Sequence, residues 1–542
     1  MNRQQWVMAY VIAAVSLWMI VSALTALRPG RRGLFAAFAY PVGWAAGELP
    51  VQAIIVQLAL LALLRWWGWP RTSWLGPLVL ILALVVTLEN LVLIVVQLLS
   101  RTVVRRALAA SPRRPLSVGR PREDVAGSWW RTMLQVPFHP SNVQVVANVA
   151  YGAHPRQVLD IWRTSRTPQN APVIIYFHGG AWTFGDKREQ GRPMLHEFVE
   201  RGWIVVTSNY RLAPSNRWPA HIVDAKRVLG FTKKNIANYG GDPQRVVVAG
   251  GSAGGHLASL LALSEREEWL SPDQADVADW SVRGCVALYS VLEMTGDETH
   301  WHGLGHGLRI LLERRVVQVP FHDNVALYEQ MSPLHRIDAD SPPFLVVQGG
   351  NDTLVDVNVA RGFVEKFRRV ALAPIYYVEL PLTQHAFDHT ASPRTSATLR
   401  AAVAFAESVT AHRRPLNEEL LASYQSPPVE VLVAVGESQW EPATDVASRR
   451  GSFYVVSADN AFSNPLDSGN ELRRRELDDL ARSRGLSALP ALGRDPSGGW
   501  PEEKGLAIFE QSEEFCRALG RAFEQHAIYE VTPDDCRVVV VS

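Results

Sequence analysis

The chain has 542 residues and a formal net charge of +1, with 54 basic residues against 53 acidic ones. That length exceeds one ordinary hydrophobic core and predicts two or three folded units. The balanced charge supplies no field that would attract nucleic acid, so we expect no nucleic-acid partner. The Cys residues, Cys285, Cys516 and Cys536, lack the spacing of a metal site and predict buried, reduced thiols.

The first part of the chain contains apolar runs long enough to cross a bilayer. Trp6–Leu27 and Leu78–Leu99 are almost uninterrupted, and each reaches the roughly 20 residues that a spanning helix needs. Between them, Leu34–Trp67 is apolar but broken near its middle, so its second half could span and its first half could be re-entrant. We therefore predict a transmembrane region over residues 1–110 with three helices, four being the alternative. A signal peptide is disfavoured because no small-residue cleavage site follows the first run.

Arginines follow the first and the last apolar run, and an Arg- and Pro-rich collar extends from Arg101 to Arg122. Because Lys and Arg near membrane helices stay on the cytoplasmic side, this placement predicts that the C-terminal part faces the cytoplasm of a bacterial cell membrane. The collar could contact anionic lipid headgroups. Glu89 lies in the last run, where a charge is costly; we interpret it as a helix-packing residue, with a lipid or substrate contact as the alternative.

From Val143 onward, short runs typical of buried strands alternate with segments of helical spacing. This alternation predicts an α/β fold with a mainly parallel sheet and helices on both faces, over residues 111–412. The predicted strands are Val158–Trp162, Val173–Phe177, Ile204–Ser208, Val246–Ala249, Val286–Tyr289, Phe344–Gln348 and Ile375–Leu380. The predicted helices are His221–Tyr239, Gly255–Leu263, Asn358–Val370 and Ser396–Val409.

The segment Gly250–Gly254 has the pattern G-x-S-x-G and lies between a predicted strand and a predicted helix. Glycines at these places permit a tight turn that lifts the Ser252 hydroxyl clear of the sheet. The pattern alone is common, but at a strand-to-helix turn it predicts a nucleophile.

Another strand, Val173–Phe177, ends in His178 and a run of small residues. Backbone N–H groups in such a turn can face a developing oxyanion. The oxyanion hole is therefore predicted at Gly179, Gly180 and Ala181, with donors from the last two and from the N–H of Ala253. We interpret His178 as a structural residue rather than a base.

The remaining two groups of a catalytic triad are predicted at later strand ends. Asp352 follows the strand Phe344–Gln348 and can orient an imidazole, while Asp356 is its rival and is better placed to cap the next helix. His385 lies on the loop after the last strand, from which it could accept the Ser252 proton and return it to the leaving group. The chain order Ser, Asp, His is that of the α/β-hydrolases.

Residues about 140 to 412 resemble the hormone-sensitive-lipase-like bacterial esterases and their carbohydrate-esterase-like and formamidase-like relatives. The matching segments are His178–Trp182 (HGGAW), Asn209–Pro214 (NYRLAP), Tyr239–Pro243 (YGGDP), Gly250–His256 (GGSAGGH) and His385–Phe387 (HAF). The resemblance implies a serine esterase or carboxylesterase without a cofactor, and a cap built from flanking segments. The membrane-linked architecture also resembles bacterial membrane-associated lipases, which favours a lipid ester substrate.

The chain departs from many of these relatives at Gly251, where they have Asp, and at Ala181, where lipase-like members have a third glycine. A His-rich run, His300–His306, lies in a segment that often forms a lid; we interpret it as a cap or pocket wall rather than a metal site. His256, after the nucleophile, is interpreted as structural. No metal and no cofactor are predicted.

A linker over residues 413–428 separates a smaller unit, residues 429–542, in which strands and helices predict an α+β domain. The predicted strands are Val429–Val435, Phe453–Ser457, Leu506–Phe509 and Val538–Val541; the predicted helices are Glu471–Arg484 and Glu513–Phe523. Its motifs resemble a small bacterial domain of unknown function. This resemblance does not indicate an activity, and the partner of the domain is unknown. Gln525 and His526 could serve a site there, but a buried polar pair or a helix end is the favoured interpretation.

The sequence therefore predicts a membrane-anchored serine hydrolase that cleaves carboxylic esters, with membrane lipids around it. The alternatives are an amidase or formamidase, which uses the same acyl-transfer groups, and a binding or scaffold protein on a retired hydrolase fold. Since every predicted catalytic group lies beyond Tyr151, we also expect residues 1 to about 110 to be removable without loss of activity on short esters. Equal loss on short and long esters would instead mean that the membrane helices help to build the pocket.

Overall fold

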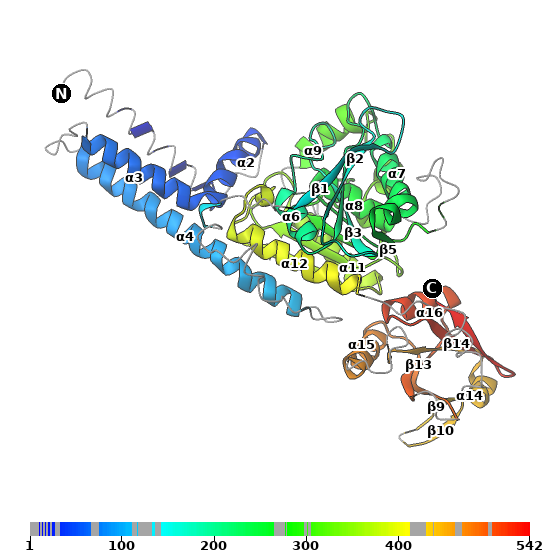
Figure 1. Ribbon diagram of the computed structural model, residues 1–542. Coiled ribbons are helices and arrows are strands. Elements are labelled where there is room, and N and C mark those ends of the chain that lie inside the picture. Colours follow the sequence, from blue (N-terminus) through cyan, green and yellow to red (C-terminus); the bar gives the residue numbers. More distant parts are fainter. Residues whose placement is uncertain are drawn as a thin grey trace.

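The computed structural model shows a helical N-terminal region, an α/β domain and a small C-terminal domain in chain order (Figure 1). The structure describes separate positions between residues 10 and 27, and then residues 33–66, 75–110, 116, 133–135, 142–264, 277, 279–296, 301, 305–411, 430–436, 438–460, 469–496 and 501–541. The predicted linker and most of the apolar run Trp6–Leu27 lie outside the described residues, as does most of the collar after Ala110.

The α/β domain is built on a sheet of eight strands in the order β1-β2-β4-β3-β5-β6-β7-β8. The pairs β1–β2 and β2–β4 are antiparallel, and the remaining neighbours are parallel. The strands are β1 (Val143–Ala150), β2 (Val158–Thr164), β3 (Ala171–Phe177), β4 (Ile204–Ser208), β5 (Gly241–Gly251), β6 (Gly284–Leu288), β7 (Phe344–Gly349) and β8 (Ile375–Leu380). The mainly parallel sheet that the alternating pattern predicted is confirmed.

Helices cover both faces of this sheet. Four of the described helices connect parallel strands, two shorter ones lie between β6 and β7, and the longest one follows β8. The helices are α6 (Arg192–Glu200), α7 (Ala220–Asn235), α8 (Ala253–Leu263), α9 (Gly305–Leu311), α10 (Val325–Gln330), α11 (Val357–Val370) and α12 (Pro393–Val409). Short turns of 3-10 or π-helix lie at Ile236–Tyr239, Leu312–Val316, Pro333–Arg336 and Phe387–His389.

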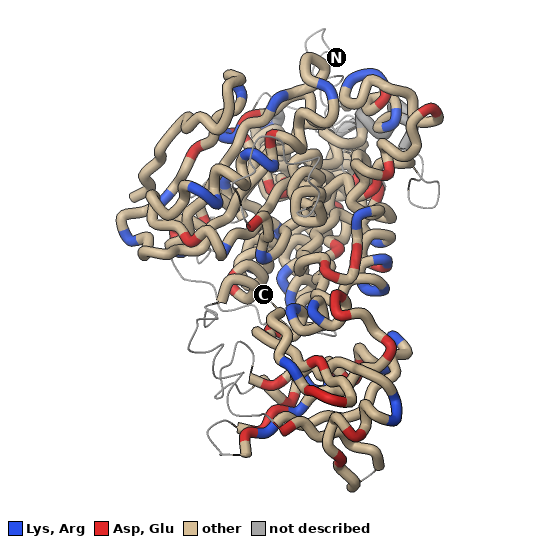
Figure 2. The backbone as a smooth tube through the Cα atoms, turned by 90° about the vertical axis from the view of Figure 1, so that its right-hand side faces the viewer, with Lys and Arg blue, Asp and Glu red and all other residues tan. Residues whose placement is uncertain are grey.

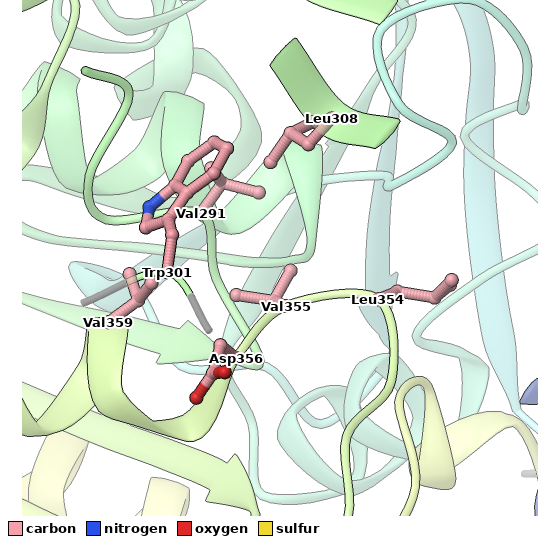
Figure 3. Close-up of a pocket in the computed structure, with 7 residues that line it drawn as sticks. All are labelled: Val291, Trp301, Leu308, Leu354, Val355, Asp356 and Val359. Atoms are coloured by element: carbon pink, nitrogen blue, oxygen red, sulfur yellow. The ribbon is translucent and has the colours of Figure 1, made fainter. Parts of the chain in front are cut away.

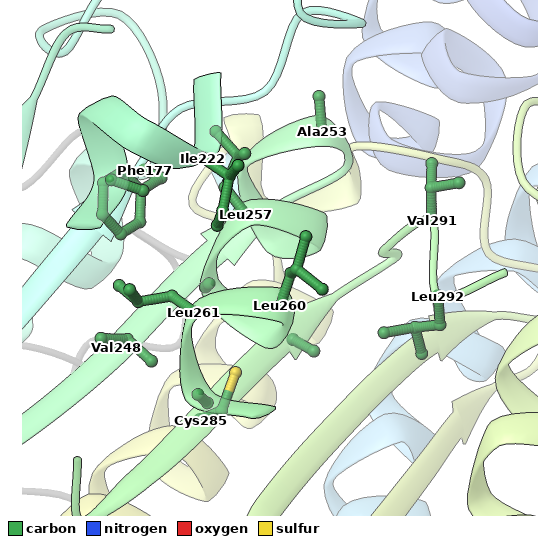
Figure 4. Close-up of a cluster of buried hydrophobic side chains, with 14 of the residues drawn as sticks. Phe177, Ile222, Val248, Ala253, Leu257, Leu260, Leu261, Cys285, Val291 and Leu292 are labelled. Atoms are coloured by element: carbon green, nitrogen blue, oxygen red, sulfur yellow. The ribbon is translucent and has the colours of Figure 1, made fainter. Parts of the chain in front are cut away.

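Alternate residues of each central strand enter different cores, as the period of two in a strand requires. Val173 and Ile175 of β3 pack with α7, α8 and α11, whereas Ile174 and Tyr176 pack with α6 and α12. Figure 4 shows the first core at α8, where Leu257, Leu260 and Leu261 lie among Phe177, Ile222, Val248 and Cys285. The central strands are apolar throughout because both faces are buried.

The N-terminal region contains α2 (Gly33–Glu48), α3 (Pro50–Trp66) and α4 (Leu75–Ala109). Within the described residues, Pro77–Ala109 is the one straight helix long and apolar enough to cross a membrane. Ala39–Glu48 and Pro50–Leu63 pass the same test only as a pair, bent by 86° at Leu49. The break predicted inside Leu34–Trp67 is therefore present, while the total of three or four spans stays a prediction.

The C-terminal part of helix α4 is buried in the core of the α/β domain. Val104 and Leu108 are buried in the same cluster as Ile174 of β3 and Phe405 of α12. α4 lies alongside α12 in Figure 1 and also packs against β8. The apolar helix α4 therefore packs directly against the α/β domain.

The C-terminal domain is an antiparallel sheet of seven strands in the order β10-β9-β12-β13-β11-β14-β15. Its elements are β9 (Glu430–Ala434), β10 (Trp440–Pro442), α14 (Ala443–Arg450), β11 (Phe453–Ser457), α15 (Asn470–Ser483), β12 (Ala488–Arg494), β13 (Glu503–Phe509), α16 (Glu513–Ala522), β14 (Ala527–Val531) and β15 (Cys536–Val540). α15 and α16 cover one face and α14 the other. The predicted α+β class is confirmed, with acidic and basic residues interleaved along the domain (Figure 2).

The two domains share a small interface. Leu372, after α11, is buried in the same cluster as Leu480 and Leu519 of the C-terminal domain. Arg521 of α16 makes a bidentate ion pair with Asp340, with distances of 2.8 and 2.5 Å. These contacts fix the C-terminal domain on the side where α11 ends.

Candidate active site

Ser252 lies on the turn between β5 and α8, at the carboxyl end of the sheet. Its backbone has φ 55° and ψ −123°, a conformation that non-glycine residues rarely adopt. Its N–H donates to Leu288 O at 3.0 Å, and its carbonyl accepts from His256 N at 2.9 Å. These bonds hold the strained residue between neighbouring strand and helix.

Glycines surround Ser252 because the backbone passes close to other strands. A Cβ on Gly254 would lie 2.0 Å from Phe177 O, and a Cβ on Gly250 would lie 2.4 Å from the Gly254 carbonyl. A side chain at either place would force the turn apart. The G-x-S-x-G pattern thus has a steric cause in this chain.

Asp352 and His385 form a buried pair at the ends of β7 and β8. Their side chains meet through Asp352 Oδ2 and His385 Nδ1 at 2.7 Å, and they are 3% and 4% exposed. Asp352 Oδ1 accepts from the N–H groups of Leu354 and Val355, each at 2.8 Å. Gln348 Nε2 donates to Asp352 Oδ2 at 2.9 Å. With Nδ1 bound to the carboxylate, Nε2 is the ring nitrogen left for chemistry.

Gln384 joins the loop that carries Asp352 to the loop that carries His385 through hydrogen bonds. Its Oε1 accepts from Thr353 N at 2.8 Å and from His385 N at 3.0 Å. The pair is therefore fixed by backbone contacts on both sides, as an orienting group must be.

Tyr289, directly after β6, lies between the Ser252 turn and His385. Its ring centroid is 4.7 Å from that of His385, and its hydroxyl donates to Asp388. A Cβ on Gly251 would lie 2.5 Å from Tyr289 Oη. This contact explains why the chain has glycine where many relatives have Asp: the tyrosine occupies the space of that side chain.

The small-residue turn after β3 approaches Ser252 directly. A Cβ on Gly179 would lie 3.2 Å from Ser252 Cβ and 2.9 Å from Gly251 O. The N–H of Gly179 already donates to Gln190 Oε1 at 2.7 Å. In the described part of the chain, the N–H groups of Gly180, Ala181 and Ala253 make no hydrogen bond. The absence of a side chain at Gly179 therefore lets this turn approach Ser252. The Gly179 amide already donates to Gln190 and is not available to bind an oxyanion.

The structure brings together Asp352 with His385, and Ser252 with the small-residue turn. Among the described residues, neither Ser252 Oγ nor His385 Nε2 makes a hydrogen bond, although both flank Tyr289. Catalytic hydrogen bonds are often long in proteins without substrate and shorten only when it binds.

The other histidines near the turn are buried and structural. His178 stacks on Tyr210 at 4.4 Å, and its Nδ1 bonds Gly179 O at 2.7 Å. His256 Nε2 bonds Met331 O at 2.7 Å. Burial lowers the pKa of His178, His221 and His256 to about 4, so each is neutral at pH 7. These contacts agree with the interpretation of His178 and His256 as structural residues.

Asp356 caps the helix after the acid loop, as predicted. Its Oδ1 accepts from Asn358 N at 3.0 Å at the start of α11. His385 pairs with Asp352 instead.

A cavity lies beside the acid loop (Figure 3). It is a small hollow that opens to solvent, with a cavity volume of about 10 Å³. Its lining is apolar apart from one carboxylate: Val291, Trp301, Leu308, Leu354, Val355, Asp356 and Val359. Trp301 comes from the His-rich run, whose His300 and His302 lie outside the described residues. The interpretation of this run as a pocket wall is supported by Trp301. No cluster of His, Cys, Asp and Glu suited to a metal occurs in the described part.

Sequence reasoning missed Tyr289, Gln348, Gln384 and Gln190, which orient the site. Tyr289 could have been found as the residue that ends a buried strand. The three glutamines carry no local signal, because their partners are set by the fold. In the C-terminal domain, Gln525 and His526 are buried, and Gln525 Nε2 donates to Asp459 O at 2.9 Å, which agrees with a buried polar pair.

The sheet order, the strained serine turn and the acid–histidine pair together define an α/β-hydrolase fold. The family model BD-FAE matches residues 159–367. Two relatives from Mycobacterium tuberculosis are similar: "Probable carboxylic ester hydrolase LipM", 44% identical over 46% of this chain and 58% of that protein, and "Esterase LipC", 35% identical over 50% of this chain and 67% of that protein. The chain belongs to this esterase family of α/β-hydrolases.

The match to LipM covers less than two thirds of that protein's length. Among solved structures, esterase B from Lactobacillus rhamnosis is similar with 20% identity and a TM-score of 0.43, over 52% of this chain and 91% of that one. Residues 456–528 match the model DUF3293, described as a protein of unknown function.

Proposed function

We propose that the protein is a membrane-anchored serine hydrolase that cleaves carboxylic esters through an acyl-enzyme on Ser252. The observation that carries the proposal is the buried Asp352–His385 pair, at 2.7 Å, at the same sheet edge as the strained Ser252 turn. Relatives named as ester hydrolases favour an ester over an amide.

In this mechanism Ser252 Oγ attacks the acyl carbon while His385 Nε2 takes the hydroxyl proton. The C–O bond to the alcohol then breaks, and the imidazolium returns the proton to the leaving alkoxide. Water attacks the acyl-serine by the same route and releases the acid. Asp352 holds His385 in the required tautomer and stabilises the imidazolium.

The oxyanion is assigned to the N–H groups of Gly180, Ala181 and Ala253. Each lacks a protein acceptor in the described part of the chain, so each can donate without breaking another hydrogen bond. The strained backbone of this turn, with φ 113° at Gly180 and 50° at Ala181, holds the amides in place before substrate binds.

Labelling with a fluorophosphonate tests the nucleophile. We expect Ser252→Ala to abolish labelling and hydrolysis of short esters while the protein stays folded. Ser264→Ala is the matched control, because Ser264 is buried at the other end of α8. Full activity in Ser252→Ala would refute the mechanism. Labelling absent from the wild-type protein would favour a scaffold on a hydrolase fold.

The membrane assignment rests on α3 and α4. Apolar side chains project from both helices and are more than half exposed, among them Val56, Leu58, Leu80, Ile81 and Leu84. Such a surface is stable in hydrocarbon and costly in water. We expect the protein to stay in the membrane pellet after carbonate washing; release into the supernatant would contradict anchoring.

The proposed cytoplasmic orientation rests only on the placement of arginines. Reporter fusions at the C-terminus decide it, since a reporter active only after export would place the hydrolase domain outside.

For the substrate, an anchored site favours esters with apolar chains at the bilayer surface. The mainly apolar cavity beside Leu354 and Val355 supports this class. A hydrolysis screen over acyl length, with matched amides, is the direct test. A preference for amides would replace the esterase by an amidase of the same mechanism.

A further inference from the structure

Helix α2 lies directly against the loop that carries His385. Trp44 Nε1 donates to Ala386 O at 3.0 Å, and the Tyr40 ring lies edge-on to the His385 ring at 6.1 Å. A Cβ on Gly43 would lie 3.4 Å from Gln384 Nε2. One face of α2 therefore contacts the residues on either side of the catalytic histidine and the histidine itself.

The C-terminal end of α2 is joined to α12 by a buried ion pair, and the Arg394 side chain of that pair also reaches the histidine loop. Arg394 Nη1 lies 2.6 Å from Glu48 Oε1, and both side chains are fully buried. Arg394 also donates to Gly47 O at 2.9 Å and to Leu382 O at 3.3 Å. A buried pair of this kind leaves an uncompensated charge if either partner is lost, so it holds the two elements in one arrangement.

The loop Leu382–Ala386 carries His385, and the two residues at its ends have strained backbones. The carbonyls of these two residues accept the hydrogen bonds from Arg394 and Trp44. Leu382 has φ 50° and Ala386 has φ 54°, both in the left-handed region that non-glycine residues avoid. Such residues persist only where the surroundings hold them. Leu382 O accepts from Arg394, and Ala386 O accepts from Trp44 and from His389. His385 lies between these two strained residues, so its position depends on both.

Helix α2 is itself held by α4. Gln97 Nε2 of α4 donates to Gly47 O at 2.7 Å, and α4 packs through Val104 and Leu108 into the hydrolase core. In Figure 1, α2 lies between α4 and the loops at the edge of the α/β domain. The apolar helices and the catalytic loop thus form one packed unit.

We propose that Trp44 and the Glu48–Arg394 pair are positioning residues of the active site, which hold the strained Leu382–Ala386 loop so that His385 faces Ser252. This inference rests on the proposed function of Ser252 and His385. It replaces the sequence-based expectation that residues 1 to about 110 form a removable anchor. The helical region is part of the catalytic apparatus, and activity on short and long esters depends on it equally.

The first experiment compares Trp44→Phe with Trp66→Phe in the full-length protein in detergent micelles. Phe keeps a ring at position 44 but removes the donor to Ala386 O, and Trp66 is 85% exposed on α3. Fluorophosphonate labelling gives the rate per site and the fraction of active protein. We expect Trp44→Phe to label to full extent but roughly ten- to hundredfold more slowly, the effect of a slightly misplaced catalytic group. For a short ester, kcat should fall while KM is unchanged.

A rescue variant separates positioning from general packing. Glycine adopts φ near 54° without strain, so Ala386→Gly added to Trp44→Phe should recover most of the lost labelling rate. If Trp44 only packs α2 against the domain, the fraction labelled should fall at an unchanged rate, and glycine should not restore it. Val104→Ala weakens the packing of the apolar helices on the domain away from the loop. This control variant should lower the labelled fraction and leave the labelling rate unchanged.

The ion pair is tested by Glu48→Gln and by the double change Glu48→Met with Arg394→Met, which replaces the pair with apolar side chains of similar length. We expect the double variant to fold and to label slowly, because Leu382 O has lost its donor. Wild-type labelling rates in both Trp44→Phe and the double variant would overturn the proposal. A wild-type protein that does not label at all, or a Ser252→Ala variant that does, would instead refute the proposed function on which it rests.

Discussion

The two sheets of the molecule bury polar groups in opposite ways. At the carboxyl edge of the larger sheet, strained residues such as Ser252 and Ala181 accompany backbone N–H groups that have no acceptor among the described residues. In the smaller sheet, the Asn460 and Asn470 side chains bond each other at 3.0 Å, and Asp459 Oδ2 accepts from Lys504 N at 2.8 Å. The difference indicates that the polar groups around Asp459 stabilise their own loop. At the edge of the larger sheet, in contrast, backbone N–H groups are available to bind a ligand.

Asparagine substitutions at two buried aspartates give the sharpest test of this difference. We expect Asp352→Asn to lower kcat by about 10⁴-fold, because the His385 tautomer is lost, and His385→Ala to be at least as damaging. Asp459→Asn should leave activity per folded molecule unchanged and lower the free energy of unfolding by about 1–3 kcal/mol.

Initial rates with a short ester and urea unfolding measure the two effects. Asp356→Asn is the control for the acid, because it removes only a helix cap. If it cripples the enzyme while Asp352→Asn does not, the acid is misassigned.

Acid should also distinguish the two domains. His178, His221 and His256 all lie in the hydrolase domain, with pKa values lowered to about 4 by burial. In the unfolded chain each takes up a proton below about pH 6.5, while the folded protein resists until about pH 4. Stability should therefore fall as pH drops from 6.5 to 4, by about 1.4 kcal/mol per pH unit for each histidine.

Hydrogen exchange at pH 7 and pH 5 is the measurement. Protection should decrease in β3 and β5 more than in β11 and β13. His256→Gln can still donate to Met331 O. It should remove the share of the pH dependence of stability that His256 contributes. An equal loss of protection in both sheets would contradict burial as the cause.

Alanine substitutions at two glycines, one in each domain, should have effects of intermediate size. Alanine at Gly251 would contact Tyr289 and displace the residue that packs on His385, so we expect a roughly ten- to hundredfold loss of kcat. Alanine at Gly485, where φ is 62° and nothing lies within 4 Å, should cost only about 1 kcal/mol of stability through backbone strain. Normal kcat in Gly251→Ala would show that Tyr289 has no part in placing the histidine.

The smallest effect is expected at the boundary between the domains. Arg521→Ala removes the ion pair with Asp340, which is partly exposed, so stability should change by about 0.5–1 kcal/mol. Hydrolysis should stay within about twofold of wild type, the size expected for a weak surface pair. Limited proteolysis between the domains should accelerate. A large loss of hydrolysis would show instead that the C-terminal domain controls the active site.

Much of the fold could be predicted because its signals are local. The strands Ile204–Ser208 and Ile375–Leu380 coincide with β4 and β8, since each is a short run bounded by turn residues. β12 was missed because Pro490 and Gly493 disfavour a strand, yet it pairs with both β9 and β13. There, pairing on both sides outweighs local preference.

The proposed catalytic groups lie in motifs at strand ends, whereas the residues that contact them carry no such motif. Trp44 and Ala386 are 342 residues apart, and α2 is apolar on all sides, so hydropathy alone predicts a membrane helix there. The contact between α2 and the histidine loop depends on tertiary packing that no local pattern encodes.

The pairing of Glu48 with Arg394 has a consequence for the time course of biosynthesis. The two residues are 346 positions apart. At a synthesis rate of about 5–20 residues per second, Glu48 emerges roughly 20 to 70 seconds before its partner. During that interval its carboxylate needs water or a temporary partner, because a lone charge is poorly tolerated in hydrocarbon. Ser252, Asp352 and His385 are all translated before Arg394, so a nascent chain holds the whole proposed triad before Arg394, which contacts both α2 and the histidine loop, has been made. Hydrolytic competence would therefore arise late, when α12 packs against a helix made early in synthesis.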